Sequence, residues 1–318
     1  MAEELDLDEL PVGTKLAGRY RICERVGVGG MSQVYRAEHT TITRQLAIKV
    51  LSGEFTRRPD VVVRFLQEAR AASQVAHENV VEVTDFGETE DGRPFIVMEY
   101  LEGESLAATL LAEGPFSWGR TRGILLQILA ALTAAHSHRV IHRDMKPGNC
   151  FRIRRHGTDD FIKVLDFGIA KVLREDGTGI SLTAQGTVMG TPDYMSPEQC
   201  RGTKVDPRAD LYALGVMAYE MLSGKLPFAA KHPVDVMHMH VFEEAPPIPE
   251  IAPEAEVPVA AMKVVKRAMA KEPDDRFANA AAFADAVRAI DPELPKASPP
   301  PDSGLLTGLR RLLGRRRD

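Results

Sequence analysis

The hydrophobic pattern of the chain changes near residue 100, and this change limits the folds that the chain can adopt. Before that point the apolar residues occur mostly in short β-type runs bounded by turn residues. One segment with helical spacing interrupts them, beginning at Pro59 and extending to about residue 76. After Gly103 the pattern is mainly helical. The expected strands are 20–26, 33–39, 45–51, 80–86 and 95–99.

Helix boundary signals in the second part of the chain support this division. Asp206 followed by Pro207 predicts the start of a helix, and Gly224 predicts its end. Asn279 is expected to begin the last helix, with Phe283 on its apolar face. The sequence therefore predicts an α+β fold, in which a small β-rich part precedes a larger, mainly α-helical part.

Composition excludes several classes of protein. The net charge of −5 gives no reason to expect a nucleic-acid partner. The apolar segment 124–135 is interrupted by Gln127 and is too short to cross about 30 Å of hydrocarbon, so it is expected to be a buried helix. The acidic N-terminus does not resemble a signal peptide. Cys23, Cys150 and Cys200 are widely spaced, which favours a reducing, cytoplasmic location.

A glycine-rich segment, GVGGMSQV at 27–34, lies between two expected strands. Glycines allow a loop to approach phosphates closely and to direct backbone N–H groups at them. A dinucleotide-binding turn is the rival interpretation, but it should be followed by a helix. Residues 33–37 have the pattern of a strand, which favours a phosphate-covering hairpin.

Lys49 ends an apolar β run and lies between Ile48 and Val50. A buried lysine is costly unless it has an anionic partner, and a carboxylate together with a polyphosphate would supply one. Glu68 on the following helix is the best candidate, because its neighbours Phe65 and Ala69 are expected to face the core.

The segment IHRDMKPGN at 141–149 places three chemically useful groups within eight residues. Asp144 can accept a hydroxyl proton, Lys146 can balance the charge of a phosphoryl group, and Asn149 can bind a metal ion. Asp166 follows a short apolar strand in VLDFG and can bind Mg²⁺ together with Asn149.

Together these motifs resemble the protein-kinase superfamily, specifically the Hanks-type (eukaryotic-like) serine/threonine kinases of bacteria. The order of glycine loop, strand lysine, H-R-D, D-F-G and S-P-E is the order of that family, and the resemblance covers roughly residues 16–290. It implies a bilobal protein-kinase fold with one regulatory helix in the small lobe. It also implies a non-specific serine/threonine protein kinase that uses ATP and Mg²⁺, with Mn²⁺ as an alternative ion.

The resemblance assigns roles to individual residues. Asp144 is expected to be the catalytic base, and Lys146 to stabilise the transferring phosphoryl group. Lys49 is expected to contact the α- and β-phosphates while paired with Glu68. The expected ATP-binding residues are Val26, Gly27, Val28, Gly29, Gly30, Met31, Ser32, Gln33, Val34, Ala47 and Lys49, with Met98 as gatekeeper and Glu99 and Leu101 in the hinge.

Two positions depart from the family pattern: Ser32 replaces the third glycine of the loop, and Ser196 replaces the alanine of A-P-E. Both positions accept a small side chain, so the departures bear on loop flexibility more than on activity. Lys146, two residues after Asp144, is the serine/threonine pattern rather than the tyrosine pattern. Thr191 matches the threonine that contacts the base aspartate in that class.

The resemblance also implies a switch and a structural frame. Arg143, directly before the base, is expected to pair with a phosphorylated activation loop. Thr187 is the expected primary site of autophosphorylation in trans, and Thr183 the second. Glu198 is expected to pair with Arg276, and Asp210 to brace the H-R-D backbone.

The expected organisation has four segments. Residues 1–13 form an acidic flexible arm, and 14–290 form the kinase domain, with a small lobe at about 14–100 and a large lobe at about 101–290. A proline-rich linker at 291–303 precedes a basic amphipathic tail at 304–318, which can contact a partner or an anionic inner-membrane surface. Protein substrates are expected, and a homodimer for phosphorylation in trans stays open.

Two functions other than catalysis are alternatives for this chain. A pseudokinase usually lacks the strand lysine, the base or the metal aspartate, whereas Lys49, Asp144 and Asp166 are all present. A signalling scaffold anchored by its tail would depend on residues 292–318. His238 and His240 alternate with methionines and are expected on a solvated helix face rather than at a metal site.

Overall fold

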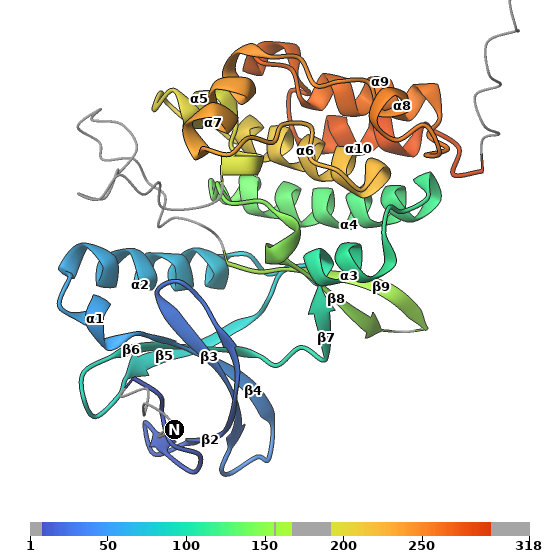
Figure 1. Cartoon of the computed structure of the whole chain (residues 1–318). Coiled ribbons are helices and arrows are strands. Elements are labelled where there is room, and N and C mark those ends of the chain that lie inside the picture. Colours follow the sequence, from blue (N-terminus) through green and yellow to red (C-terminus); the bar gives the residue numbers. More distant parts are fainter. Residues whose placement is uncertain (1–7, 156, 167–191, 294–318) are drawn as a thin grey trace, which may run out of the picture.

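The structure is a computed structural model that describes residues 8–155, 157–166 and 192–293. Figure 1 shows two lobes, a small one built on a curved sheet and a large one built on helices. The expected α+β architecture is therefore confirmed. The change in hydrophobic pattern near residue 100 corresponds to the passage from one lobe to the other.

The small lobe contains a six-stranded antiparallel sheet with strand order β1-β2-β3-β4-β6-β5. Helix α2 lies against this sheet and buries Phe65, Ala69 and Ala72. Pro59 occupies its first position, as the sequence predicted. The elements are β1 (Lys15–Leu16), β2 (Tyr20–Val28), β3 (Ser32–His39), β4 (Gln45–Leu51), α1 (Gly53–Thr56), α2 (Pro59–Gln74), β5 (Val83–Glu88) and β6 (Pro94–Glu99).

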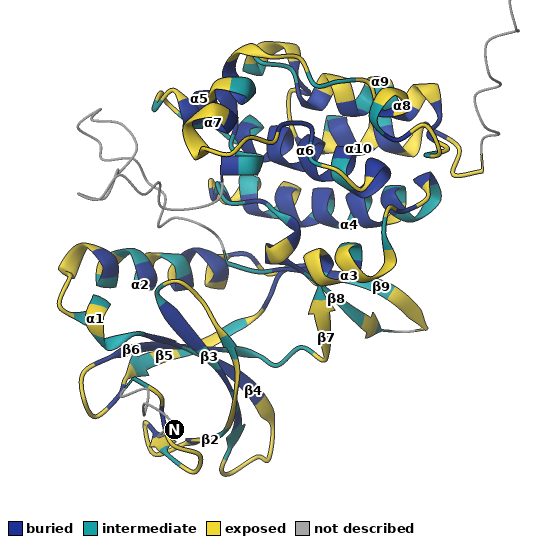
Figure 2. Cartoon of the chain, in the orientation of Figure 1, coloured by how far each residue is buried: buried dark blue, intermediate teal, exposed yellow. Residues whose placement is uncertain are grey.

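The large lobe is a helical bundle around one apolar core. Helices α4 and α6 run through its centre, and Figure 2 shows them as mostly buried. The segment 124–135 lies within α4, so its assignment as a buried helix is confirmed. The helices are α3 (Leu106–Glu113), α4 (Trp118–Ser137), α5 (Pro197–Cys200), α6 (Arg208–Ser223), α7 (Pro233–Phe242), α8 (Ile248–Ile251), α9 (Val259–Ala268) and α10 (Ala280–Arg288).

The helix ends follow the signals in the sequence. Gly224 adopts φ 69° and ends α6, a conformation that glycine reaches without strain. The Asp206 carboxylate accepts a hydrogen bond from the backbone N–H of Arg208, 2.8 Å away. Asn279 accepts one from Ala282 at the start of α10. Within the described part of the chain, no helix is long and apolar enough to span a bilayer.

A second sheet lies between the helices and the small lobe, with strand order β7-β8-β9. Its β8–β9 hairpin was not expected beyond the short strand before Asp166. The hairpin connects the segment 141–149 to Asp166. The strands are β7 (Gly103–Ser105), β8 (Cys150–Arg155) and β9 (Thr158–Val164), and single 3₁₀ turns occur at Pro147–Asn149, Pro192–Tyr194 and Pro273–Asp275.

Residues 8–13, which were expected to belong to a flexible arm, pack against the small lobe. The Asp8 carboxylate accepts hydrogen bonds from the backbone N–H of Gly53, with distances of 2.9 and 3.0 Å. Arg93 donates to the Asp8 carbonyl at 2.6 Å. Leu10 is only 7% exposed and belongs to the core of the sheet. Residues 1–7 and 294–318 lie outside the described residues.

Candidate active site

The glycine-rich segment forms the hairpin between β2 and β3. Gly27 pairs with Val34, and the N–H of Gly29 donates to the carbonyl of Ser32 at 2.7 Å. A strand therefore follows the loop, and the dinucleotide-binding interpretation, which requires a helix there, is excluded. Val26 and Val28 are exposed on β2, whereas the Ser32 and Gln33 side chains are buried.

Two glycines of this hairpin, Gly27 and Gly30, leave open space, whereas a Cβ atom on Gly29 would lie 3.4 Å from the carbonyl oxygen of Ser32. None of the three glycines, Gly27, Gly29 and Gly30, has a positive φ. A Cβ atom built on Gly30 would meet nothing within 4 Å, and one on Gly27 would reach only Val34, at 3.9 Å. The missing side chains thus keep free a surface that a phosphate group could approach.

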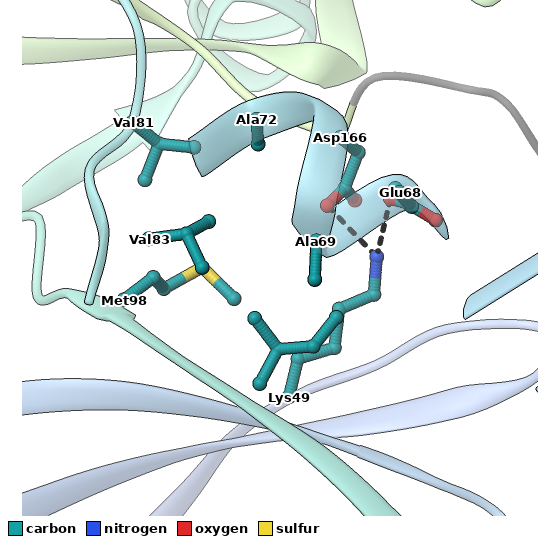
Figure 3. Close-up of a pocket in the computed structure, with 9 residues that line it drawn as sticks. Lys49, Glu68, Ala69, Ala72, Val81, Val83, Met98 and Asp166 are labelled. Atoms are coloured by element: carbon teal, nitrogen blue, oxygen red, sulfur yellow. Dashed lines mark hydrogen bonds and ion pairs between the residues drawn. The ribbon is translucent and has the colours of Figure 1, made fainter. Parts of the chain in front are cut away.

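Lys49 lies on β4 at the centre of a small charged cluster. Its Nζ is 3.1 Å from Glu68 Oε1 on α2 and 2.8 Å from Asp166 Oδ1, which follows β9. Figure 3 shows the three side chains pointing toward one another from these separate elements. The ion pair expected from the sequence is present, and it joins both lobes.

Burial and charge act in opposite directions on this cluster. Burial lowers the pKa of Lys49, but the negative charges of Asp166 and Glu68 outweigh burial, so the net pKa is raised. Burial and the neighbouring Asp166 raise the pKa of Glu68 to about 7, against the opposing effect of Lys49. Partial burial raises the pKa of Asp166, whose side chain is 42% exposed, but the charge of Lys49 outweighs burial, so the net pKa is lowered. Lys49 therefore carries a positive charge at neutral pH.

The catalytic loop brings Asp144, Lys146 and Asn149 together. Lys146 Nζ is 2.8 Å from Asp144 Oδ2. The Asn149 amide donates to the same carboxylate oxygen at 3.1 Å and to the Asp144 carbonyl at 2.8 Å. The 3₁₀ turn Pro147–Asn149 folds the loop back on itself and permits these contacts. These contacts fix the position of the Asp144 carboxylate.

Asp210 on helix α6 supports this loop through two hydrogen bonds. Its carboxylate accepts hydrogen bonds from the backbone N–H groups of His142, at 2.9 Å, and of Arg143, at 2.8 Å. Arg143 adopts φ 64°, a conformation that is unfavourable for a residue with a side chain. The buried carboxylate therefore stabilises a strained turn directly before Asp144. This is the bracing contact that the resemblance predicted.

Asn149 and Asp166 come close together through the β8–β9 hairpin. Cys150 pairs with Val164, and the N–H of Leu165 donates to the Asn149 carbonyl at 2.8 Å. With the Asn149 amide nitrogen bonded to Asp144, its amide oxygen is left to act as a ligand. One amide oxygen and one carboxylate fit a hard divalent cation that keeps water and phosphate in its shell. The two residues are thus suitable for Mg²⁺.

An apolar wall continues the cleft beside the charged cluster. Met98 on β6 pairs with Ala47 on β4, and Figure 3 shows Met98 together with Val81 and Val83 lining a pocket next to Lys49. Met98 lies at the end of this pocket, where a gatekeeper would control its depth. Leu101 follows β6 in the segment that joins the lobes.

Glu99 has a buried partner that was not expected from the sequence. Lys163 is 6% exposed, and its Nζ lies 2.6 Å from Glu99 Oε1. The same oxygen accepts from the backbone N–H of Glu82 at 2.8 Å. The Glu99 side chain therefore points away from the cleft and fixes the hinge backbone to β9. The signal in the sequence was a lysine inside an otherwise apolar strand, Phe161 to Val164.

A second buried ion pair supports the large lobe. Both Glu198 oxygens lie 2.7 Å from the Arg276 guanidinium nitrogens, and the Arg276 side chain is fully buried. The pair expected between these residues is present. Thr183, Thr187 and Thr191, like the phenylalanine and glycine of D-F-G, lie outside the described residues.

Comparisons with known proteins agree with this geometry. Residues 20–287 match the family described as protein kinase domain. The serine/threonine-protein kinase pkn3 of Myxococcus xanthus is 43% identical over 288 residues, which make up 91% of this chain and 52% of that protein. The serine/threonine-protein kinase PknB of Mycolicibacterium smegmatis is 39% identical over 286 residues, covering 89% of this chain and 44% of that protein.

A solved structure shows the same fold. The crystal structure of the Mycobacterium tuberculosis PknI kinase domain has a TM-score of 0.67 and 27% sequence identity, and the match covers 88% of this chain and 98% of that one. The chain spans about half the length, or less, of the curated relatives it matches. Since the family match extends from the second strand to the last helix, the chain belongs to the protein kinase domain family.

Proposed function

We propose that this chain is a serine/threonine protein kinase, which transfers the γ-phosphoryl group of ATP to serine or threonine hydroxyls of proteins. The observation that carries the proposal is the contact of Lys49 with both Glu68 and Asp166. This contact aligns the phosphate-binding lysine of the small lobe with the metal-binding aspartate of the large lobe. The relatives named as serine/threonine-protein kinases support the same activity.

In the proposed reaction the acceptor hydroxyl oxygen forms a bond to the γ-phosphorus while the bond to the bridging β–γ oxygen breaks, and ADP leaves. Asp144 accepts the hydroxyl proton, and its position is set by Lys146 and Asn149. Lys146, 2.8 Å from the base, also balances the charge of the transferring group. The proton therefore moves from the acceptor to Asp144 as the phosphoryl group moves from ATP to the acceptor.

ATP and a divalent cation complete the proposed site. The open surface at Gly27 and Gly30 suits the phosphates, and Lys49 contacts the α- and β-phosphates. Asn149 and Asp166 would hold Mg²⁺, or Mn²⁺ in its place. When bound, the cation would neutralise negative charge on the phosphates.

We also propose that phosphorylation of Thr187, and secondarily Thr183, switches the enzyme. The Nε atom of Arg143 is buried and has no hydrogen-bond partner within residues 8–155, 157–166 and 192–293. A buried unsatisfied donor on a cationic group favours an incoming anion, and a phosphate would fill that role. Ser/Thr phosphorylation near Arg143 would thus stabilise the strained turn before Asp144.

The switch can be tested by mass spectrometry after incubation with Mg²⁺ and ATP. Wild type is expected to carry phosphate on Thr187 or Thr183, and the double change Thr187→Ala with Thr183→Ala to lower activity. Asp144→Asn protein mixed with wild type reports whether the transfer occurs in trans. Unchanged activity of the double variant would refute the switch while leaving the kinase proposal intact.

Acceptor class is tested with three peptides that differ only in carrying serine, threonine or tyrosine at one position. Labelled ATP is expected to transfer phosphate to the serine and threonine peptides only. Transfer to the tyrosine peptide alone would contradict the proposed specificity. ATP binding without transfer to any peptide would favour the pseudokinase interpretation.

The proposed setting is the cytoplasm, with protein substrates and no nucleic acid. Cys23, Cys150 and Cys200 are free thiols, as a reducing compartment requires. The basic tail at 304–318 is proposed to contact a partner or an anionic membrane surface. Equal binding to anionic vesicles by the full chain and by a chain ending at Pro292 would exclude the membrane contact.

A further inference from the structure

His240 does not lie on a solvated helix face, as the sequence analysis expected, but is fully buried. It belongs to the last turn of α7. Its Nδ1 lies 2.9 Å from the hydroxyl of Tyr212 on α6, and its Nε2 lies 3.0 Å from the carbonyl oxygen of Asp193. The carbonyl can only accept, so Nε2 carries the proton and Nδ1 accepts from Tyr212. Both ring nitrogens are therefore used.

The surroundings keep this imidazole neutral and fixed in orientation. The ring packs edge-on against Phe228, with centroids 4.9 Å apart. Burial, and secondarily the nearby Lys271 ammonium, lowers the pKa of His240 to about 4. Lys271 in turn donates to the carbonyl of His240 at 2.8 Å and holds the end of α7. At neutral pH the ring thus has one donor and one acceptor, which match the two groups that face it.

The Asp193 carbonyl, which accepts the hydrogen bond from His240, lies in a segment that borders the loop carrying Asp144. Asp193 belongs to the turn Pro192–Tyr194, which is directly followed by α5. Gln199 in α5 donates to the carbonyl of Arg143 at 2.8 Å, and Arg143 precedes the proposed base. Tyr194 donates to Glu220 on α6 at 2.6 Å. The segment 192–200 is therefore fixed to α6, to α7 and to the loop that carries Asp144.

Because Gln199 bonds to the residue directly before Asp144, a protein acceptor whose hydroxyl reaches Asp144 comes close to this segment. We propose that His240 is a positioning residue for the protein acceptor: it holds the Asp193 carbonyl so that the segment 192–200 presents the acceptor to Asp144. The inference rests on the proposed kinase function. Within the part of the chain that the structure describes, its hydrogen bonds and ring contacts are with Tyr212, Asp193, Lys271 and Phe228, none of which is an expected ATP-binding or metal-binding residue. We therefore expect its effect on the acceptor rather than on ATP.

A buried histidine can also serve only the stability of the core, and the variants must separate these two roles. His240→Leu removes both hydrogen bonds. His240→Gln keeps an N–H donor at a similar distance from the backbone and can still reach Asp193. Tyr212→Phe removes only the bond to Nδ1, in the same buried place, and is the matched control for disturbance of the core.

The measurement is steady-state phosphorylation of a serine peptide selected from a degenerate library, together with ATP hydrolysis in the absence of peptide. His240→Leu is expected to raise the peptide KM by about tenfold, the cost of one well-formed hydrogen bond. The KM for ATP and peptide-free ATP hydrolysis are expected to stay within about twofold of wild type. His240→Gln and Tyr212→Phe are expected to keep a peptide KM close to wild type.

Several outcomes would overturn the inference. One is a His240→Leu enzyme with an unchanged peptide KM. Another is an equal loss in peptide phosphorylation and peptide-free ATP hydrolysis, which indicates general damage to the fold. If His240→Leu does not fold, His240→Asn replaces it, since the shorter amide cannot reach Asp193, and a peptide KM equal to that of His240→Gln would refute the role. Absence of transfer by wild type would refute the kinase proposal instead.

Discussion

Lys49 Nζ and Glu68 Oε1 lie 3.1 Å apart, although one residue belongs to strand β4 and the other to helix α2. Both side chains are 13% exposed. The orientation of the lysine is therefore set by the position of the helix. A movement of α2 away from the sheet would break the pair and release the lysine from the phosphate site, so this contact couples the fold of the small lobe to its chemistry.

Glu68→Gln tests this coupling. The amide cannot balance the charge of Lys49, so the lysine is expected to be less well placed and kcat/KM for peptide phosphorylation to fall about 100-fold. Glu54→Gln, which changes an exposed carboxylate in the neighbouring helix α1, is the control and should leave kcat/KM unchanged. Equal rates for both variants would show that Glu68 does not position Lys49.

The buried pair of Glu198 and Arg276 makes a prediction about stability. Glu198→Gln leaves the guanidinium, which has no exposed surface, without its counter-charge. The expected loss in the free energy of unfolding is about 3 to 5 kcal/mol. Glu244→Gln breaks an ion pair in which both side chains are about four-fifths exposed, and it should have no measurable effect. Chemical denaturation measures the free energy of unfolding of both variants. Similarly small losses for the two would show that the buried pair does not stabilise the fold.

The docked N-terminal segment makes a third prediction. Asp8→Ala removes the acceptor for the Gly53 N–H at the start of α1 and is expected to cost about 1 kcal/mol of unfolding free energy. Glu9→Ala, its neighbour, loses only a partly exposed contact with Arg25 and serves as the control. If Asp8→Ala and Glu9→Ala have the same melting temperature, Asp8 does not hold the segment.

His240 predicts how stability depends on pH. Its pKa falls from the ordinary 6.5 to about 4 in the folded chain, so the folded state binds fewer protons between these values. Its contribution to stability is complete above pH 6.5 and is lost as the pH falls toward 4. The neighbouring groups are Tyr212, Lys271 and the Asp193 carboxyl, whose pKa burial raises.

The measurement compares wild type with His240→Gln by chemical denaturation at pH 7 and pH 4.5. Wild type should lose more stability than the variant across this range, by an amount on the order of 3 kcal/mol at most. His238→Gln alters an exposed histidine on the same helix and should follow wild type. If His240→Gln loses as much stability as wild type, the conclusion that His240 is buried in its neutral form is wrong.

Local signals predicted most of the fold. The strand 45–51 coincides with β4, and Pro59 and Gly224 mark helix ends because their backbone preferences act within one turn. The cluster of Asp144, Lys146 and Asn149 could also be predicted, because the three residues lie within a few positions of one another. The strand predicted at 80–86 instead forms at Val83–Glu88, since the residues before it bond to β9 rather than to the sheet.

Contacts between distant parts of the chain were not predictable in this way. Asp8 and Gly53 are 45 residues apart, and Lys163 and Glu99 are 64 apart. The pattern near His240 predicted a helix but does not reveal that Asp193 supplies a carbonyl from another segment. Such partners depend on how the elements pack, and only some of them, such as Lys163 and His240, stood out as polar residues with apolar neighbours.

The most direct test of the central claim is phosphoryl transfer by Asp144→Asn. The change keeps the shape of the side chain and its contact with Asn149 but removes the group that accepts the hydroxyl proton. The account predicts that ATP–Mg²⁺ binding persists with a similar Kd, while transfer to a serine peptide falls by about 100-fold or more. Transfer at the wild-type rate would contradict the account, because Asp144 would then not be the base of this site.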